Sequence, residues 1–136
     1  MLKKRIIPKF LFKFQNINEK LLPTFVISKK FTDLKTVGSI IPQAKIYEAQ
    51  LADELMILNI IDKKSSKDVE FLGFLKKFSE QIFMPLTVGG GVKTLECFKI
   101  LLKNGADKIF INSEAINNPD LIKSASKKFG SQCVVV

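Results

Sequence analysis

Short runs of β-branched and aliphatic residues alternate along the chain with longer stretches in which apolar residues recur every three or four positions. The short runs predict buried strands, and the longer stretches predict helices with one apolar face. The expected strands are residues 5–12, 21–27, 54–61, 86–88, 108–111 and 133–136, and the expected helices are residues 40–50, 67–78, 95–104 and 118–128. The first two strands are candidates for a hairpin, set off by the polar stretch 15–18.

Local signals support the ends of these helices. Pro42 fits the first turn of the helix expected over residues 40–50. Thr94 is suited to cap the helix expected over residues 95–104, and Gly105 is placed to end that helix. Asn118-Pro119-Asp120 combines a capping residue, an initial proline and an acid in the first turn, and Gly130 is expected to stop that helix.

The alternation of helices with buried strands predicts an α/β fold with a parallel sheet and right-handed crossovers. An open α/β sheet and roughly half of a (β/α)₈ TIM barrel both fit this order. A closed barrel needs about 250 residues, and the 136 residues here hold about four and a half βα units. Because the sequence stops inside a strand, we favour the half barrel and expect residues 1–136 to form a single partial barrel domain.

Charge and composition narrow the classes of partner. The chain carries 22 basic and 13 acidic residues, a net charge of +9, and its one arginine is Arg5. Nucleic-acid readers depend strongly on arginine, so we interpret the lysines as a solvated surface and expect no nucleic-acid partner. Attraction of a phosphorylated small molecule is compatible with the charge.

The chain has no histidine, which excludes histidine catalysis and histidine-containing metal sites. Cys97 and Cys133 lack zinc-site spacing, so we expect free buried thiols in a reducing compartment, without a metal or a cofactor. The basic start is interrupted by Pro8 and no cleavage site follows it. We therefore expect a cytoplasmic protein that does not cross a membrane.

Three consecutive glycines, Gly89-Gly90-Gly91, stand between a predicted strand and a predicted helix. Glycine there lets backbone N–H groups face an anion. A tight turn is the simpler alternative. The next strand ends in Asn112 and Ser113, which are also able to bind an anion, and two neighbouring βα loops of this kind are typical of a barrel phosphate site.

Several motifs, taken together and in order, resemble the N-terminal half of the cyclase subunit of imidazole glycerol phosphate synthase. They are Arg5-Ile6-Ile7-Pro8, Ala52-Asp53-Glu54-Leu55, Pro85–Val92, Gly105-Ala106-Asp107-Lys108, Ile111-Asn112-Ser113 and Gly130–Val136. The match covers most of the chain from Ala52 onward and is weak between Phe10 and Gln50. The resemblance implies a (β/α)₈ barrel, a glutaminase partner that supplies ammonia, and a phosphorylated substrate held by Gly90, Gly91, Asn112 and Ser113.

The resemblance also assigns residues at the other end of the barrel. Arg5, Glu54 and Lys108 match three members of a charged ring that gates ammonia, and Asp107 matches an acid on the glutaminase docking face. Plain solvent exposure is the alternative for the three ring residues. However, the three fall at the starts of different strands, and in a barrel these positions converge on one floor. A fourth gate acid is expected beyond Val136.

The catalytic rim departs from the family, so we assign no catalytic residue. Lys9 and Leu11 stand where the family has a cysteine and an aspartate, and Leu11 cannot transfer a proton. Asn59 replaces an acid, and Pro23 replaces a loop lysine. Asp62 is a possible substitute acid, although a solvated loop residue is the simpler interpretation, and the family's second aspartate is expected beyond Val136.

Three hypotheses therefore stay open. The first is an ammonia-receiving synthase subunit, either the cyclase of histidine biosynthesis or a relative of the glycosyl amidation-associated protein WbuZ, which also has a leucine at the first-strand position. The second is a non-catalytic, phosphate-binding allosteric partner. The third is an inactive half barrel that pairs or aggregates through its open sheet edges.

Overall fold

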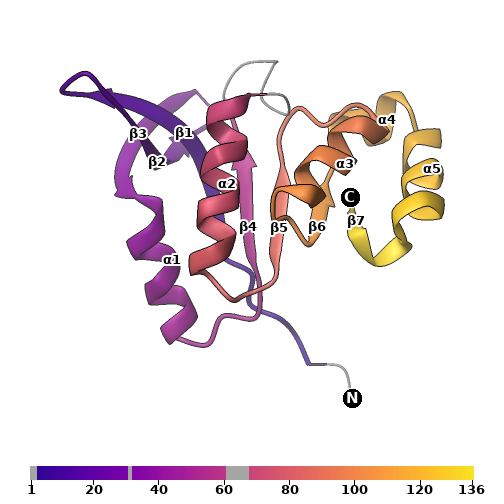
Figure 1. The fold of residues 1–136 in the computed structure, drawn as a ribbon, viewed down its shortest axis with the longest axis horizontal. Coiled ribbons are helices and arrows are strands. Elements are labelled where there is room, and N and C mark those ends of the chain that lie inside the picture. Colours follow the sequence, from indigo (N-terminus) through magenta and orange to yellow (C-terminus); the bar gives the residue numbers. More distant parts are fainter. Residues whose placement is uncertain (1–2, 31, 61–67) are drawn as a thin grey trace.

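The computed structural model describes residues 3–30, 32–60 and 68–136, which form one sheet with helices beside it (Figure 1). The strands run in the order β3-β2-β1-β4-β5-β6-β7 across the sheet. They are β1 (Lys9–Ile17), β2 (Lys20–Lys29), β3 (Asp33–Ser39), β4 (Leu55–Asn59), β5 (Leu86–Gly89), β6 (Lys108–Phe110) and β7 (Val134–Val135). The helices are α1 (Ile40–Ala49), α2 (Val69–Gln81), α3 (Leu95–Lys103), α4 (Ser113–Asn117) and α5 (Asp120–Phe129), and a 3₁₀ turn, η2, covers Ser131–Cys133.

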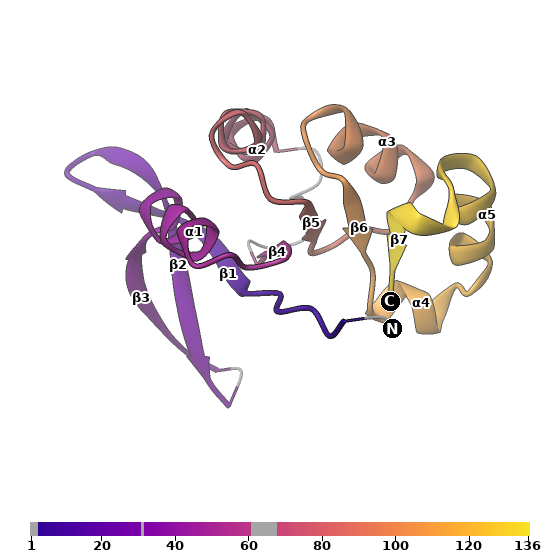
Figure 2. The ribbon, with the colours of Figure 1, turned by 90° about the horizontal axis from the view of Figure 1, so that it is seen from below.

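Five of the strands, β1, β4, β5, β6 and β7, pair in parallel, and helices connect them. Figure 2 shows that α1, α2, α3 and α5 lie on the same side of this curved sheet. The α/β class and the partial barrel predicted from the sequence are confirmed. The arrangement brings the carboxyl ends of neighbouring strands to one edge, where βα loops build binding sites.

An aromatic and aliphatic core fills the space between the sheet and the helices. Phe12 is fully buried and stacks on Phe74 of α2 with ring centroids 4.6 Å apart. Ile57, Val88 and Ile109 lie next to one another on successive strands and are also fully buried. Because strand side chains alternate between faces, the residues between them, such as Met56 and Thr87, face the opposite, inner side.

The first strand is the clearest correction to the sequence analysis. It was expected over residues 5–12 but covers Lys9–Ile17, and it turns at Asn18 and Glu19, which have φ values of 51° and 62°. The expected break at residues 15–18 is therefore wrong, because pairing with β2 extends the strand. Pro8 has no N–H to donate to a ladder, although its carbonyl accepts a hydrogen bond from Met56 N at 2.9 Å. The hairpin itself is confirmed.

Two elements lie where the sequence analysis assigned no strand or helix: β3 and the short helix α4. Six of the seven β3 residues are exposed, so the strand has no apolar pattern to reveal it. Smaller differences concern ends: β4 stops at Asn59 rather than at residue 61, α2 continues to Gln81, and β7 begins only at Val134.

Most of the predicted helix signals are present where they were expected. The exception is Asn118: α5 begins at Asp120 with Pro119 as its N-cap, and no side chain makes a capping hydrogen bond there. The Thr94 hydroxyl oxygen accepts a hydrogen bond from Cys97 N at 3.3 Å and so caps α3. Gly105 has a φ of 110°, and a Cβ there would lie 2.2 Å from Ser79 Oγ. Gly130, with a φ of 95°, directly follows α5. These residues end or begin helices through local geometry, which explains why their sequence signals sufficed.

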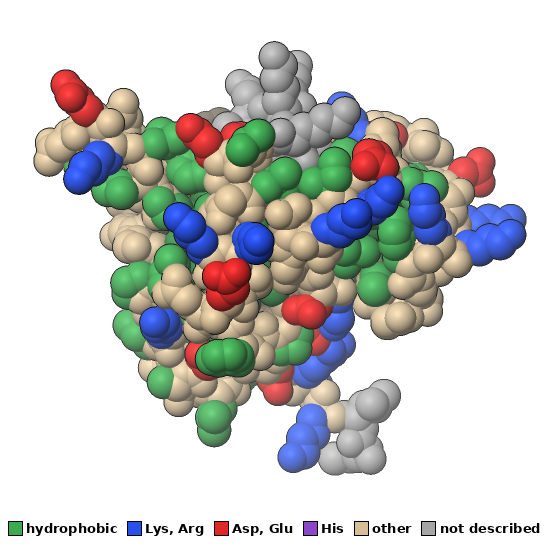
Figure 3. All heavy atoms as spheres, in the orientation of Figure 1, with side chains coloured by type: hydrophobic (Ala, Val, Ile, Leu, Met, Phe, Trp, Pro, Cys, Tyr) green, Lys and Arg blue, Asp and Glu red, His purple; other side chains and the backbone are tan. Residues whose placement is uncertain are grey.

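The helical face of the molecule is mixed in character. Figure 3 shows basic side chains interspersed with acidic and apolar ones on the face it presents. Cys97 is buried and Cys133 half-buried, and neither forms a disulfide. Within residues 3–30, 32–60 and 68–136, no helix has the length and apolar character needed to span a membrane.

Candidate functional site

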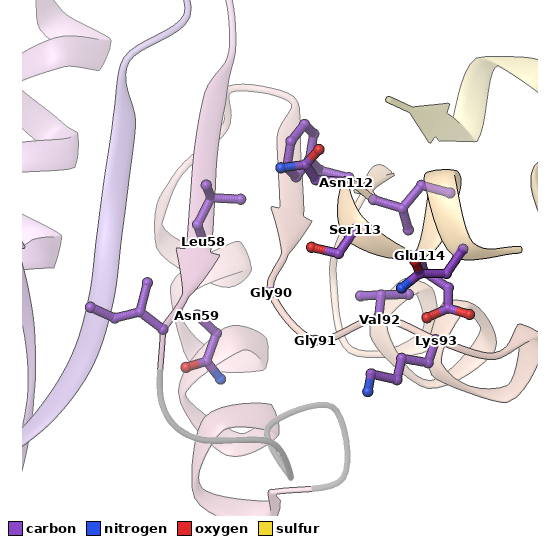
Figure 4. Close-up of a pocket in the computed structure, with 13 residues that line it drawn as sticks. Leu58, Asn59, Gly90, Gly91, Val92, Lys93, Asn112, Ser113 and Glu114 are labelled. Atoms are coloured by element: carbon purple, nitrogen blue, oxygen red, sulfur yellow. The ribbon is translucent and has the colours of Figure 1, made fainter. Parts of the chain in front are cut away.

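A cleft of about 390 Å³ opens at the carboxyl ends of β4, β5 and β6. Its walls come from the ends of these strands and from the two loops that follow β5 and β6 (Figure 4). The lining residues are Leu58, Asn59, Ile60, Gly90, Gly91, Val92, Lys93, Phe110, Ile111, Asn112, Ser113, Glu114 and Asn117. All four residues predicted to hold a phosphate thus line a single cleft, although they come from two separate loops.

The glycine run is shaped by close approach of its neighbours. A Cβ on Gly89 would lie 2.8 Å from the Phe110 carbonyl oxygen, and one on Gly90 would lie 2.0 Å from the Asn59 carbonyl oxygen. Gly90 and Gly91 have φ values of 107° and 66°, which favour glycine. Close packing is therefore sufficient to explain why glycine occupies positions 89 and 90. The same packing brings the backbone of the loop to the wall of the cleft.

Asn112 and Ser113 follow β6 and lead into α4. Both are exposed, and in Figure 4 the Ser113 hydroxyl points toward the Gly90 loop. The helix that begins at Ser113 has only five residues, so its dipole adds little. The side chains and loop backbone therefore have to supply most of any anion binding here.

The sequence analysis missed three polar residues that line the cleft: Lys93, Glu114 and Asn117. Lys93 lies two residues after the glycine run, and Glu114 is adjacent to Ser113. Because Lys93 and Glu114 lie so close in sequence to the predicted phosphate-binding residues, they could have been considered as part of the site. The sequence does not show, however, in which direction each side chain points.

A second cluster lies at the opposite end of the strands. The Glu54 carboxylate is 5% exposed and binds two cations, the Arg5 guanidinium and the Lys108 ammonium. Lys108 Nζ donates to both oxygens of Glu54, at 2.8 and 2.9 Å. The structure thus joins the three residues that were predicted to converge, and the ion pairs take the place of water around the buried carboxylate.

The backbone explains how these three side chains meet. Glu54 directly precedes β4 and Lys108 begins β6, with only β5 between them in the sheet. The segment before β1 is held beside β4 because Ile6 N donates to Asp53 Oδ2 at 2.7 Å and Asp53 N donates to the Ile6 carbonyl at 3.1 Å. This anchor brings Arg5 to the cluster.

Asp107 lies next to this cluster and already has a structural partner. Its carboxylate accepts a hydrogen bond from Leu86 N at 2.8 Å, and its own N–H donates to the Leu86 carbonyl at 2.8 Å. The residue is exposed and also lines a cavity of about 310 Å³. Its predicted role in docking a partner therefore has to be separated from its role in holding the start of β5.

Comparison with known proteins identifies the family. The sequence profile described as "Histidine biosynthesis protein" matches residues 24–136. The chain belongs to this histidine biosynthesis protein family. Its relatives include "Imidazole glycerol phosphate synthase subunit HisF" of Methanococcus vannielii, which is 45% identical over 136 residues, all of this chain and 47% of that protein.

Two further relatives carry the provisional name imidazole glycerol phosphate synthase subunit hisF2. The one from Prochlorococcus marinus is 43% identical over 136 residues, all of this chain and 52% of that protein. The one from Campylobacter jejuni is 44% identical over 135 residues, 99% of this chain and 50% of that protein. The chain therefore spans about half the length of the family members that it matches.

This member of the histidine biosynthesis family has few acidic groups at the rim of the strands. Lys9 begins β1 and is exposed, and Leu11 pairs with Leu58 on one side and Val26 on the other. Asn59 is 4% exposed at the end of β4, and Pro23 lies within β2. Asp62 lies outside the described residues. In the part of the chain that the structure describes, no group of three or more Cys, Asp or Glu residues is arranged to hold a metal ion.

Proposed function

We propose that the chain acts as the N-terminal half of a cyclase-type subunit in a glutamine-dependent synthase complex of the imidazole glycerol phosphate synthase family. In this proposal a glutaminase docks at the end where Glu54 lies and delivers ammonia, and the cleft at the other end binds a phosphorylated substrate. The names of the relatives support the assignment. A cytoplasmic location and a single partial barrel domain over residues 1–136 belong to the same proposal.

The observation that carries the proposal is the placement of two predicted sites at opposite ends of one strand. Lys108, the first residue of β6, belongs to the charged cluster, and Asn112 and Ser113, just past its end, line the cleft. A molecule that enters beside Lys108 and travels along the inner face of the sheet reaches the cleft. This is the geometry that ammonia transfer between two sites requires.

The charged cluster suits a gate. The buried Glu54 carboxylate is paired with both Arg5 and Lys108, so the closed arrangement does not leave this buried charge unpaired. The Arg5 side chain is 56% exposed, and it can leave the cluster at modest cost because water replaces the carboxylate. In the proposed mechanism a docked partner moves Arg5 and opens a path for neutral ammonia.

A second candidate is ammonia delivery to a sugar-amidating reaction, as in the WbuZ-like branch. Leu11 and Asn59 favour it, because neither side chain can act as a general acid or base near neutral pH. With Leu11 paired to Leu58, the described part of the rim offers no carboxylate at either position. A non-catalytic, phosphate-binding partner of the glutaminase stays the third possibility.

One experiment separates the cyclase proposal from the other two candidates. The protein is combined with its glutaminase, and glutamine hydrolysis is measured with and without the phosphorylated ribonucleotide substrate of the family. Glutamine-dependent turnover of the ribonucleotide supports the cyclase proposal. Stable binding and glutamine hydrolysis without that turnover exclude the strict cyclase and leave the amidation candidate and the non-catalytic partner, and failure to bind a glutaminase contradicts all three.

The phosphate cleft has its own test. Ser113→Ala removes a hydroxyl from the cleft, and Ser124→Ala removes an exposed hydroxyl from α5, away from it. We expect the first variant to weaken binding of a phosphate ester about 3- to 10-fold, the value of one hydrogen bond. We expect the second to leave binding unchanged. Equal effects of the two substitutions would contradict a phosphate site at this cleft.

A further inference from the structure

The phosphate cleft contains a pair of opposite charges that phosphate binding alone does not explain. Among the described residues that line it, Lys93 is the one cation and Glu114 the one anion. Lys93 is exposed in the loop after β5, and Glu114 is half-buried in the first turn of α4. Figure 4 draws both on the opposite side of the Gly90–Gly91 loop from Asn59.

A carboxylate in this place affects ligands in opposite ways. It repels a phosphate group that carries two negative charges, and the repulsion is strong in a partly enclosed site because the effective dielectric constant is low. The same carboxylate accepts a strong hydrogen bond from a hydroxyl or an ammonium group. Glu114 therefore penalises a bare phosphate and favours a phosphate ester that brings a hydrogen-bond donor.

The other polar side chains of the cleft cannot cancel the Glu114 charge. Asn59, Asn112, Asn117 and Ser113 are neutral, so they offer hydrogen bonds without countercharge. Among the described residues that line the cleft, Lys93 alone supplies a positive charge from a side chain, and its flexible stem lets the ammonium reach either Glu114 or a bound phosphate. With a donor-bearing ester in the cleft, Glu114 binds the donor and Lys93 is left for the phosphate.

We infer that Glu114 is a specificity-determining residue of this cleft and that its ligand is a phosphate monoester that also carries a hydroxyl or ammonium group. Lys93 binds the phosphate of that ligand. The inference rests on the proposed function, because it takes the cleft as the phosphate site. It adds two residues to that site, together with a chemical class of ligand.

The test compares four probes by isothermal titration calorimetry on the full chain. Inorganic phosphate and methyl phosphate have no donor on a carbon chain, glycerol 3-phosphate has hydroxyl groups, and O-phosphoethanolamine has an ammonium group. We expect the two donor-bearing esters to bind about 10- to 100-fold more tightly than methyl phosphate, in line with a hydrogen bond to a charged group. The stronger of the two identifies which donor Glu114 recognises.

Three variants complete the design. Glu114→Gln removes the charge and is expected to tighten binding of methyl phosphate while reducing the preference for donor-bearing esters, most of all for the ammonium ester. Lys93→Gln is expected to weaken all four probes by a similar factor. Glu80→Gln, on the exposed surface of α2, is the matched control and is expected to change none of them. Circular dichroism checks that each variant is folded, and Glu114→Ala serves as a second variant at that position.

The outcomes distinguish this inference from the proposed function. If the unsubstituted chain binds the phosphate probes but shows no preference for donor-bearing esters, the specificity role of Glu114 is overturned and the phosphate site stands. The same holds if the preference survives both Glu114→Gln and Glu114→Ala. If no probe binds, the proposed phosphate site and the inference are overturned together.

Discussion

Asp53 and Asp107 make the same pair of hydrogen bonds at the starts of two different strands. The Asp53 carboxylate accepts from Ile6 N at 2.7 Å, and the Asp107 carboxylate accepts from Leu86 N at 2.8 Å. Each aspartate also donates its own N–H to the carbonyl of the same partner. The two residues therefore fasten neighbouring strands together at the floor of the sheet, next to Glu54 and Lys108.

The first prediction concerns these anchors. Asp107→Ala leaves Leu86 N without its carboxylate acceptor and is expected to lower the free energy of unfolding by about 1–2 kcal/mol. Asp53→Ala is expected to cost less, because its hydrogen bond is exposed to water. Urea unfolding measures both. Asp107→Asn keeps an acceptor oxygen while removing the charge, so it is the variant to use when glutaminase docking is tested. A stable Asp107→Ala variant would show that the anchor contributes little.

The second prediction concerns Leu51 and Gly105, which precede these aspartates by two residues. Leu51 adopts a φ of 60° and is 87% exposed, whereas its counterpart is glycine with a φ of 110°. Leu51→Gly relieves a strained backbone conformation, and it loses no buried apolar area because the leucine side chain is exposed. We therefore expect the free energy of unfolding to rise by about 0.5–1 kcal/mol after the entropy of glycine is included. Thermal unfolding measures the change. Gly105→Ala is the opposing control and is expected to destabilise, since its Cβ would overlap Ser79.

The third prediction concerns the charged cluster. Glu54→Gln leaves Arg5 and Lys108 without an ionised partner and is expected to destabilise the chain by about 1–2 kcal/mol. The cost is smaller than for a fully buried pair, because the two cations are 56% and 24% exposed and can be hydrated. A double-mutant cycle with Lys108→Met measures the coupling. Strictly additive effects of the two substitutions would contradict an energetic link between these residues.

The fourth prediction concerns two glycines in different surroundings. Gly90→Ala would place a Cβ 2.0 Å from the Asn59 carbonyl oxygen at a φ of 107°, so we expect a loss of about 3 kcal/mol or more. Gly73 lies inside α2 with no atom within 4 Å of an added Cβ. Gly73→Ala is therefore expected to gain about 1 kcal/mol from helix propensity. Chemical denaturation of the two variants checks both signs, and equal effects would contradict this account of the cleft loop.

The candidate site could be predicted only in part. The four phosphate-cleft residues were found because glycines and short polar residues follow two successive predicted strands, which a parallel sheet brings to one edge. Lys93 and Glu114 were missed because a sequence does not show whether a charged loop side chain turns toward a cleft or toward solvent. Arg5, Glu54 and Lys108 were grouped by the family resemblance, with the convergence of strand starts in a barrel as support. Their ion pairs depend on tertiary contacts across 49 and 54 residues.

The sequence by itself determined the alternation of helices and strands and the ends of several helices. These features depend on local periodicity and on capping residues such as Thr94 and Gly105, which act within a few residues of their own position. The tertiary structure decided where β1 begins and ends, because its length depends on pairing with β2 and β4. The tertiary structure also decided that the exposed strand β3 forms and that the Glu114 side chain lines the cleft, since neither follows from a local apolar pattern. Both depend on contacts between segments that are distant in the chain.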